Sequence, residues 1–256
     1  MAIDSKIEWT THTFNPWWGC TKVSDGCKFC YAEAIARRYG NDVWGVNKPR
    51  RTFGEKHWAE PLKWNASAQS SGKRAQVFCA SMADVFDPAG PKDERAKLWE
   101  LIRSTPNLDW QLLTKRPEKI ERFLPTDWND GYKNVWLGTS VEDERVIGRV
   151  STLSAIPARV RFLSCEPLIG PLENLPLADI HWVIVGGESG PRSRPMLTSW
   201  VQSIRQQCRA AGVPFFFKQW GGVRKHETGR ELNGRTYDAL PRLIHRRKIE
   251  RELIAG

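Results

Sequence analysis

The sequence lacks a long apolar run, and no stretch approaches the roughly 18 consecutive apolar residues of a membrane-spanning helix. The first residues, Met1 to Lys6, do not show the basic and then apolar layout of a secretory signal peptide. Internal repeats, low-complexity tracts and long Ser/Gly linkers are missing as well. We therefore expect a cytoplasmic protein with no membrane partner.

Acidic residues are fewer than basic ones. Asp plus Glu number 29 and Lys plus Arg number 39, which gives the 256-residue chain a formal net charge of +10. A basic protein favours polyanions such as nucleic acid, nucleotides or anionic lipid, although charge alone does not specify the partner. Hydrophobic residues at 40% and charged residues at 27% are typical of a soluble globular chain that buries a sizeable core.

Short runs of apolar and β-branched residues recur along the chain, with helical patterns between most of them. Buried strands of a parallel sheet have this composition. We therefore predict an α/β fold, a partial (β/α) barrel of about six to seven parallel strands, with an open doubly wound sheet as the alternative. We expect the barrel to occupy residues 1–222 and a basic extension residues 223–256. The runs are 76–81, 110–114, 135–140, 160–164, 181–186 and 214–218, with an earlier one within 7–15.

Four helical patterns separate these runs. In the first, Tyr31, Ile35 and Tyr39 share one face, and Gly40 ends the helix. The others begin at Pro91 or carry apolar stripes over 146–153 and 201–211.

Polar and glycine-rich clusters follow nearly every predicted strand. In parallel α/β folds the chemistry lies just past the carboxyl ends of the strands, so these clusters together predict one active site. They are Trp17–Cys20, Ser81–Asp84, Thr114–Pro117, Ser140–Asp143, Ser164–Pro167, Gly186–Gly190 with Arg192 and Arg194, and Lys218–Gly222.

Three of the six cysteines, Cys20, Cys27 and Cys30, fall within eleven residues in a loop spanning 16–31. Such grouping in a reducing compartment favours a metal over disulfides. A structural zinc site needs four ligands, and His12 is the only imidazole nearby. A [4Fe–4S] cluster on three cysteines leaves one iron open for a small ligand, whereas most clusters have four cysteines. The pattern favours the cluster, with zinc or unligated thiols as alternatives.

These features resemble the radical S-adenosylmethionine superfamily, whose cysteines follow the first strand of a partial barrel and commonly have an aromatic before the last one, as Phe29 is here. The spacing is six and then two residues, where three and two are usual. The wider pattern looks like a phage- and prophage-associated family of undefined activity and, more distantly, the spore photoproduct lyase branch. The segments that carry the resemblance are Asn15–Cys20, Cys27–Glu33, Leu112–Glu118, Leu137–Glu142, Phe162–Pro167 and Val185–Gly190.

The resemblance implies that the open iron chelates S-adenosyl-L-methionine. An electron from a reductant such as flavodoxin or ferredoxin then yields a 5′-deoxyadenosyl radical, which takes hydrogen from a substrate. By their chemistry, Ser81 and Asp84 suit the methionine ammonium, and Ser140 and Glu142 suit the ribose. The segment Gly186, Gly187 and Glu188 allows close approach of the adenine.

The candidate catalytic residues are Lys115, Glu166 and Cys165. Lys115 suits the methionine carboxylate, Glu166 suits ribose or substrate, and Cys165 is a possible hydrogen donor. Simpler roles remain open, since Asp84 or Asp143 could cap a helix and the glycines could form a tight turn. We expect the isolated Cys79 and Cys208 to be core thiols.

The candidate nucleic-acid contacts are Arg116, Arg192, Arg194 and Lys218. The run Arg242–Arg251, with Arg246–Lys248 inside it, could track phosphates or form a solvated helix. The leading hypothesis is a radical enzyme that repairs or modifies a base in DNA or RNA, flipped out of the stack where it lies in a duplex. The alternatives are a radical enzyme acting on a small molecule or peptide, and a zinc-stabilised nucleic-acid-binding module.

Overall fold

A computed structural model describes residue 5 and residues 7–241. Its seven strands form one sheet, and every neighbouring pair is parallel. The strands are β1 (His12–Thr13), β2 (Ala75–Cys79), β3 (Leu108–Thr114), β4 (Val135–Ser140), β5 (Val160–Cys165), β6 (Trp182–Gly186) and β7 (Phe215–Gln219). The helices are α1 (Tyr31–Arg38), α2 (Glu55–Trp58), α3 (Glu60–Ser71), α4 (Lys92–Ser104), α5 (Ile120–Phe123), α6 (Gly148–Ser154), α7 (Thr198–Ala210) and α8 (Lys225–Thr228).

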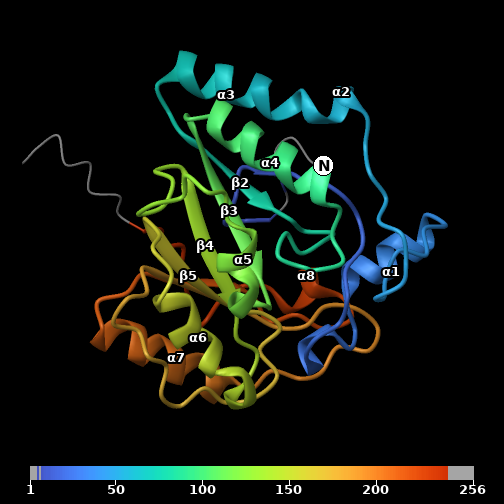
Figure 1. The fold of residues 1–256 in the computed structure, drawn as a ribbon. Coiled ribbons are helices and arrows are strands. Elements are labelled where there is room, and N and C mark those ends of the chain that lie inside the picture. Colours follow the sequence, from blue (N-terminus) through green and yellow to red (C-terminus); the bar gives the residue numbers. More distant parts are fainter. Residues whose placement is uncertain (1–4, 6, 242–256) are drawn as a thin grey trace, which may run out of the picture.

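The strands lie in the sheet in the same order as in the chain, from β1 to β7. This order confirms the partial barrel and excludes the doubly wound alternative, because a doubly wound sheet reverses its strand order at a switch point. The sheet is curled, and the longer helices lie along its outer side (Figure 1). All strand carboxyl ends therefore meet at one rim, which we call the mouth.

Alternating residues on each strand supply two separate cores. On β5, Leu163 and Cys165 face the helices, whereas Val160 and Phe162 face the interior of the curl. The interior is filled by aromatic rings, with Trp182 packed edge-on against Trp136 at a centroid distance of 6.1 Å and against Phe216 at 6.0 Å. These rings fill the barrel below the mouth, so the polar residues at the mouth lie against a packed apolar layer.

The strand positions agree with the predicted runs, but some helices do not. Our prediction from the sequence places no helix where α2 and α3 lie. The spacing of their buried residues is nevertheless helical, as Trp58, Pro61, Trp64 and Ala68 show. The helix α1 begins at Tyr31 and ends before Gly40, as predicted. Its buried residues are the small Ala32 and Ala36, whereas Tyr31 and Tyr39 are exposed.

The described part of the segment after residue 222 packs on the barrel. The Trp182 Nε1 donates to the Ala239 carbonyl oxygen at 2.8 Å, and the Phe217 amide donates to the Tyr237 carbonyl oxygen at 2.9 Å. The basic run that follows, Arg242–Arg251, lies outside the described residues. No helix among residues 7–241 is long and apolar enough to cross a membrane.

Candidate functional site: the cysteine loop and the barrel mouth

Charged side chains from four strand ends meet at the mouth. The Lys115 Nζ lies 2.8 Å from Glu142 Oε1 and 3.3 Å from the Glu166 carbonyl oxygen. Glu166 in turn accepts from Lys218 at 2.8 Å and from the Ser164 hydroxyl at 3.1 Å. The structure thus brings together Lys115, Glu142, Glu166 and Lys218, which the sequence places at separate strand ends.

Four hydrogen bonds attach the loop that carries the three cysteines to the segments that follow three strands, β2, β4 and β6. The Thr21 amide donates to Asp87 Oδ2 at 3.0 Å, and the Ser24 hydroxyl donates to Glu142 Oε1 at 3.1 Å. An Arg194 amino group donates to the Asp25 carbonyl oxygen at 3.0 Å, and a fourth contact joins the Tyr31 hydroxyl to the Ser81 carbonyl oxygen at 2.9 Å. The loop is therefore seated across the mouth.

The three thiols of this loop are free and partly exposed. Cys30 is the N-cap of α1, and the neighbouring amides of Glu33 and Ala32 act to lower the pKa of its thiol. The Arg116 Nη1 donates to the Cys20 sulfur at 3.7 Å, and the Cys27 sulfur lies 3.9 Å from the Ser24 hydroxyl. Burial, together with Asp84, raises the pKa of Cys20 to about 12, although Arg116 opposes the rise. Burial also raises the pKa of Cys30.

The chemistry of this donor set suits an iron–sulfur cluster, because three soft sulfur ligands lie in one loop and the Cys20 sulfur receives a guanidinium hydrogen bond. Within the described ranges, no three Cys, His, Asp or Glu side chains come together closely enough to hold a single metal ion.

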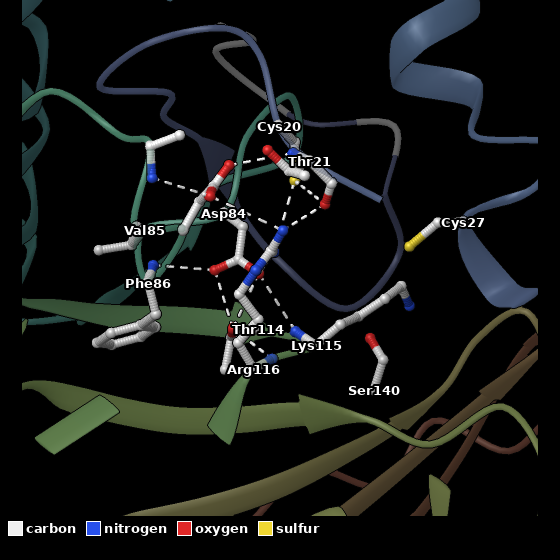
Figure 2. A network of polar contacts seen from close by, with 12 residues as sticks. Cys20, Thr21, Cys27, Asp84, Val85, Phe86, Thr114, Lys115, Arg116 and Ser140 are labelled. Carbon is white, nitrogen blue, oxygen red and sulfur yellow. Dashed lines mark hydrogen bonds and ion pairs between the residues drawn. The ribbon is translucent and has the colours of Figure 1, made fainter. Parts of the chain in front are cut away.

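Asp84 and Arg116 form a buried network behind Cys20 (Figure 2). The Arg116 Nη1 lies 2.8 Å from Asp84 Oδ2, and its Nη2 donates to the Thr21 carbonyl oxygen. Asp84 also accepts from the Thr114 hydroxyl at 2.9 Å and the Phe86 amide at 2.9 Å. Burial works against the charged form of Arg116, but Asp84 raises its pKa above the ordinary value. Only 4% of Arg116 is exposed, so this residue does not offer the surface contact with phosphate that the sequence predicts for it.

The other acids assigned to a cofactor are paired as well. Glu142 is 1% exposed, and its second oxygen accepts from Arg149 at 2.9 Å. Glu188 accepts a forked ion pair from Arg194, at 2.6 Å and 2.9 Å. A Cβ on Gly187 would lie 1.9 Å from the Trp220 carbonyl oxygen, so this glycine is required by the packing of β6 on β7. Asp143 accepts from the Arg145 amide at 3.0 Å and caps the short helix Glu144–Val146, which is the alternative role given for it in the sequence analysis.

Two further candidates, Ser140 and Gly186, line the mouth. Ser140 lies near Lys115 in Figure 2 and is 2% exposed. A Cβ on Gly186 would lie 2.7 Å from Glu166 Oε1, so the missing side chain leaves room for the Glu166 carboxylate.

Cys165 lies on the wrong side of the sheet for a hydrogen donor. It is fully buried in the outer core, on the face opposite to Ser164. Burial raises the pKa of Cys165 well above its ordinary value. Cys79 and Cys208 are both fully buried in the same outer core, in agreement with the core role expected for them.

A group of cations surrounds Phe29 within the cysteine loop. The Arg192 guanidinium lies 4.8 Å from the centroid of this ring, that of Arg194 5.3 Å, and the Lys28 ammonium 5.5 Å. Arg192 and Lys28 are exposed, whereas Arg194 is occupied by Glu188. We call Phe29, Lys28 and Arg192 the aromatic–basic patch.

Sequence reasoning missed several residues that organise the site. Arg149 reaches Glu142 from α6, and Arg50 pairs with Asp87 at 3.1 Å with both side chains 2% exposed. Ser24 contacts Glu142 from within the cysteine loop. None of these follows a strand or belongs to a spacing motif, so their roles depend on contacts between distant segments.

The fold and site define an α/β partial barrel with a three-cysteine loop at its mouth. A family model described as "Protein of unknown function (DUF5131)" matches residues 4–241, and the chain belongs to this family. No curated protein matches it.

Solved structures of spore photoproduct lyase share the fold. A cysteine-to-serine mutant has a TM-score of 0.51 and 13% identity over 81% of this chain and 63% of its own. A double mutant with bound AdoMet and dinucleoside spore photoproduct has a TM-score of 0.47 and 11% identity over 77% and 61%. The chain spans about three fifths of these lyases, and at this identity the likeness shows the fold alone.

Proposed function

We propose that this protein is a radical S-adenosylmethionine enzyme that holds one [4Fe–4S] cluster on Cys20, Cys27 and Cys30 and acts on a nucleic acid base. The observation that carries the proposal is the seating of three free thiols over the polar mouth of a parallel partial barrel. Active sites of such barrels lie at this rim. Three cysteines also leave one iron of a cubane available to a ligand.

The bound cluster and S-adenosylmethionine supply one-electron reduction and hydrogen abstraction, with the electron coming from a carrier such as flavodoxin or ferredoxin. The chain supplies position and exclusion of water. Lys115 is 21% exposed at the side chain and offers the methionine carboxylate a cation, for which it exchanges its contact with Glu142. Ser140 and Glu166 offer hydrogen-bond partners to ribose or substrate, and the aromatic interior closes the floor.

The aromatic–basic patch supports nucleic acid as the substrate class. Phe29 offers a ring on which a base can stack, and Lys28 and Arg192 are exposed cations for the adjoining phosphates. Phe29 and Lys28 of the patch lie in the same loop as the cysteines, so a bound strand is held next to the reacting centre. The alternative is a small anionic molecule or peptide, for which the patch is incidental.

Anaerobic purification with iron and sulfide quantified tests the cluster. We expect about four irons per chain, brown absorbance, and release of 5′-deoxyadenosine and methionine when the reduced protein receives S-adenosylmethionine. Stoichiometric zinc without iron after reconstitution contradicts the proposal and favours the zinc-stabilised binding module. A fully loaded, reduced cluster that cleaves no S-adenosylmethionine contradicts the radical activity.

A further inference from the structure

Arg116 connects the barrel wall to Cys20, the first cysteine of the loop. It lies two residues after β3 and contacts three groups: Asp84, the Thr21 carbonyl oxygen and the Cys20 sulfur at 3.7 Å (Figure 2). A planar guanidinium can satisfy several acceptors at once in a fixed geometry, which a lysine ammonium cannot. Arg116 therefore joins β3, the end of β2 and the cysteine loop in one contact set.

Asp84 is held so firmly that it fixes Arg116 in turn. Besides the guanidinium, it accepts from the Thr114 hydroxyl, the Phe86 amide at 2.9 Å and the Lys115 amide at 3.3 Å. Its side chain is 7% exposed and that of Arg116 is 5% exposed. These donors fix the position of the Asp84 carboxylate, and separating a buried ion pair of this kind has a large cost.

Cys20 differs from the other two cysteines in what its sulfur meets. Cys30 lies at the start of α1 beside the amides of Ala32 and Glu33, and the Cys27 sulfur lies near the Ser24 hydroxyl. In the part of the chain that the structure describes, Cys20 is the cysteine of this loop whose sulfur receives a guanidinium hydrogen bond. Hydrogen bonds and positive charge at a ligand sulfur stabilise the reduced form of an iron–sulfur cluster, since reduction adds negative charge.

We propose that Arg116, held in place by Asp84, is a positioning and tuning residue for Cys20: it locks the first cysteine against the barrel wall, and its charge raises the reduction potential of the cluster that this cysteine holds, while the charge of Asp84 offsets part of that rise. This inference rests on the proposed function for the cluster. Its positional half, the locking of residues 20–24, concerns the chain itself and is testable without iron.

Redox titration of the reconstituted protein tests the tuning. Removing the cation with R116Q should lower the equilibrium constant for one-electron reduction of the cluster at least tenfold, which lowers its reduction potential by about 59 mV. Removing the anion with D84N should shift it in the opposite direction, because Arg116 keeps its contacts with Thr21 and Cys20. R116K should stay close to the wild type in potential, since the charge remains.

Two further variants keep the test decisive. The double variant D84N/R116Q leaves no unpaired buried charge, so it folds where a single variant fails, and its potential should lie between those of the singles. R74Q is the matched control, because Arg74 pairs with Asp109 at 2.8 Å at the opposite end of β2 and β3 and should not change the potential. Equal potentials in R116Q, D84N and the wild type overturn the tuning and leave the cluster proposal intact.

Hydrogen–deuterium exchange on iron-free protein tests the locking. We expect the peptide containing residues 20–24 to exchange at least several-fold faster in R116Q and R116K than in the wild type, with the α7 peptide unchanged. Unchanged exchange in residues 20–24 overturns the locking. If wild-type protein takes up no cluster, the proposed function fails while this exchange result still decides the positional half.

Discussion

The acids at the mouth are each paired with a cation. Asp84 pairs with Arg116, Glu142 with Lys115 and Arg149, Glu166 with Lys218, and Glu188 with Arg194. Such pairs keep charges in a low-dielectric site where unpaired ones are costly. A charged ligand at this mouth therefore binds by exchanging partners with an existing pair, and the partly exposed pairs of Lys115 and Lys218 exchange at a lower cost than the buried pair of Arg116.

At the scale of single residues, the cysteines give a direct prediction. Replacing Cys20, Cys27 or Cys30 with alanine should each reduce bound iron at least tenfold after anaerobic reconstitution, because two cysteines cannot hold a cubane cluster stably. Iron per chain and visible absorbance are the measurements.

The C208A variant is the matched control for these replacements. Cys208 packs in the outer core, so its loss should cost stability by removing packing contacts but should leave the iron content per folded chain unchanged. Iron retained in all three loop variants, or lost equally in C208A, contradicts the assignment.

At the scale of elements, a short 3-10 helix, Asp25–Cys27, sets the height of the cysteine loop above the mouth. Gly26 is buried within it, and a Cβ there would lie 2.5 Å from the Glu142 carboxylate. Glu142 cannot move aside readily, because Lys115, Arg149 and Ser24 hold it. The absence of a side chain at Gly26 thus lets the loop approach β4.

We therefore expect Gly26→Ala to destabilise the protein by about 1–3 kcal/mol, the usual cost of overpacking a tight contact. It should also lower cluster occupancy, since Cys27 is the next residue. Urea unfolding and iron content measure the two effects.

Gly148→Ala serves as the comparison, because a Cβ there meets no atom within 4 Å at the start of α6. That replacement should be neutral or slightly stabilising, since alanine favours helix. Equal stability of both variants would show that the loop does not need this close approach.

The sequence predicts where the strands lie better than it predicts which side of a helix is buried. Apolar runs locate six of the strands within one to two residues, because strands buried on both sides need continuous apolar sequence. The first strand is shorter than the predicted run, since only His12 and Thr13 pair with β2. The shared face of Tyr31 and Ile35 does not reveal which side of α1 is buried, because the buried residues are the small Ala32 and Ala36 and Tyr31 is exposed.

The site is predictable as a place but not as a set of partners. The strand-end rule brings Lys115, Glu142, Glu166 and Lys218 to one rim, as the structure shows. Which cation meets which acid depends on loop geometry, which no spacing pattern encodes. The side of the sheet on which Cys165 lies follows from strand alternation, because Ser164 and Glu166 face the mouth and the residue between them faces the helices.

At the scale of the whole molecule, the basic charge is unevenly available. Much of it is neutralised within ion pairs, as Arg194 and Lys218 are at the mouth. Lys28 and Arg192 are exposed beside Phe29, whereas Lys73 is exposed near the start of β2, at the opposite end of the strands. A polyanion that binds through the mouth should therefore depend on the aromatic–basic patch more than on net charge.

This arrangement predicts nucleic acid binding whose strength falls steeply with salt. We expect single-stranded DNA or RNA to bind with a dissociation constant of roughly 10⁻⁴ to 10⁻⁶ M at physiological salt, and more tightly at low salt, because each phosphate neutralised releases counterions.

R192E should weaken binding and reduce the slope of log K against log salt concentration by about 0.7 for a single strand. K73E makes the same charge change at the other end of the barrel and should leave the slope unchanged. Fluorescence anisotropy across a salt series measures both. Equal losses in the two variants would show that net charge alone draws the polyanion, and no binding at low salt would make a small anionic molecule the leading substrate class.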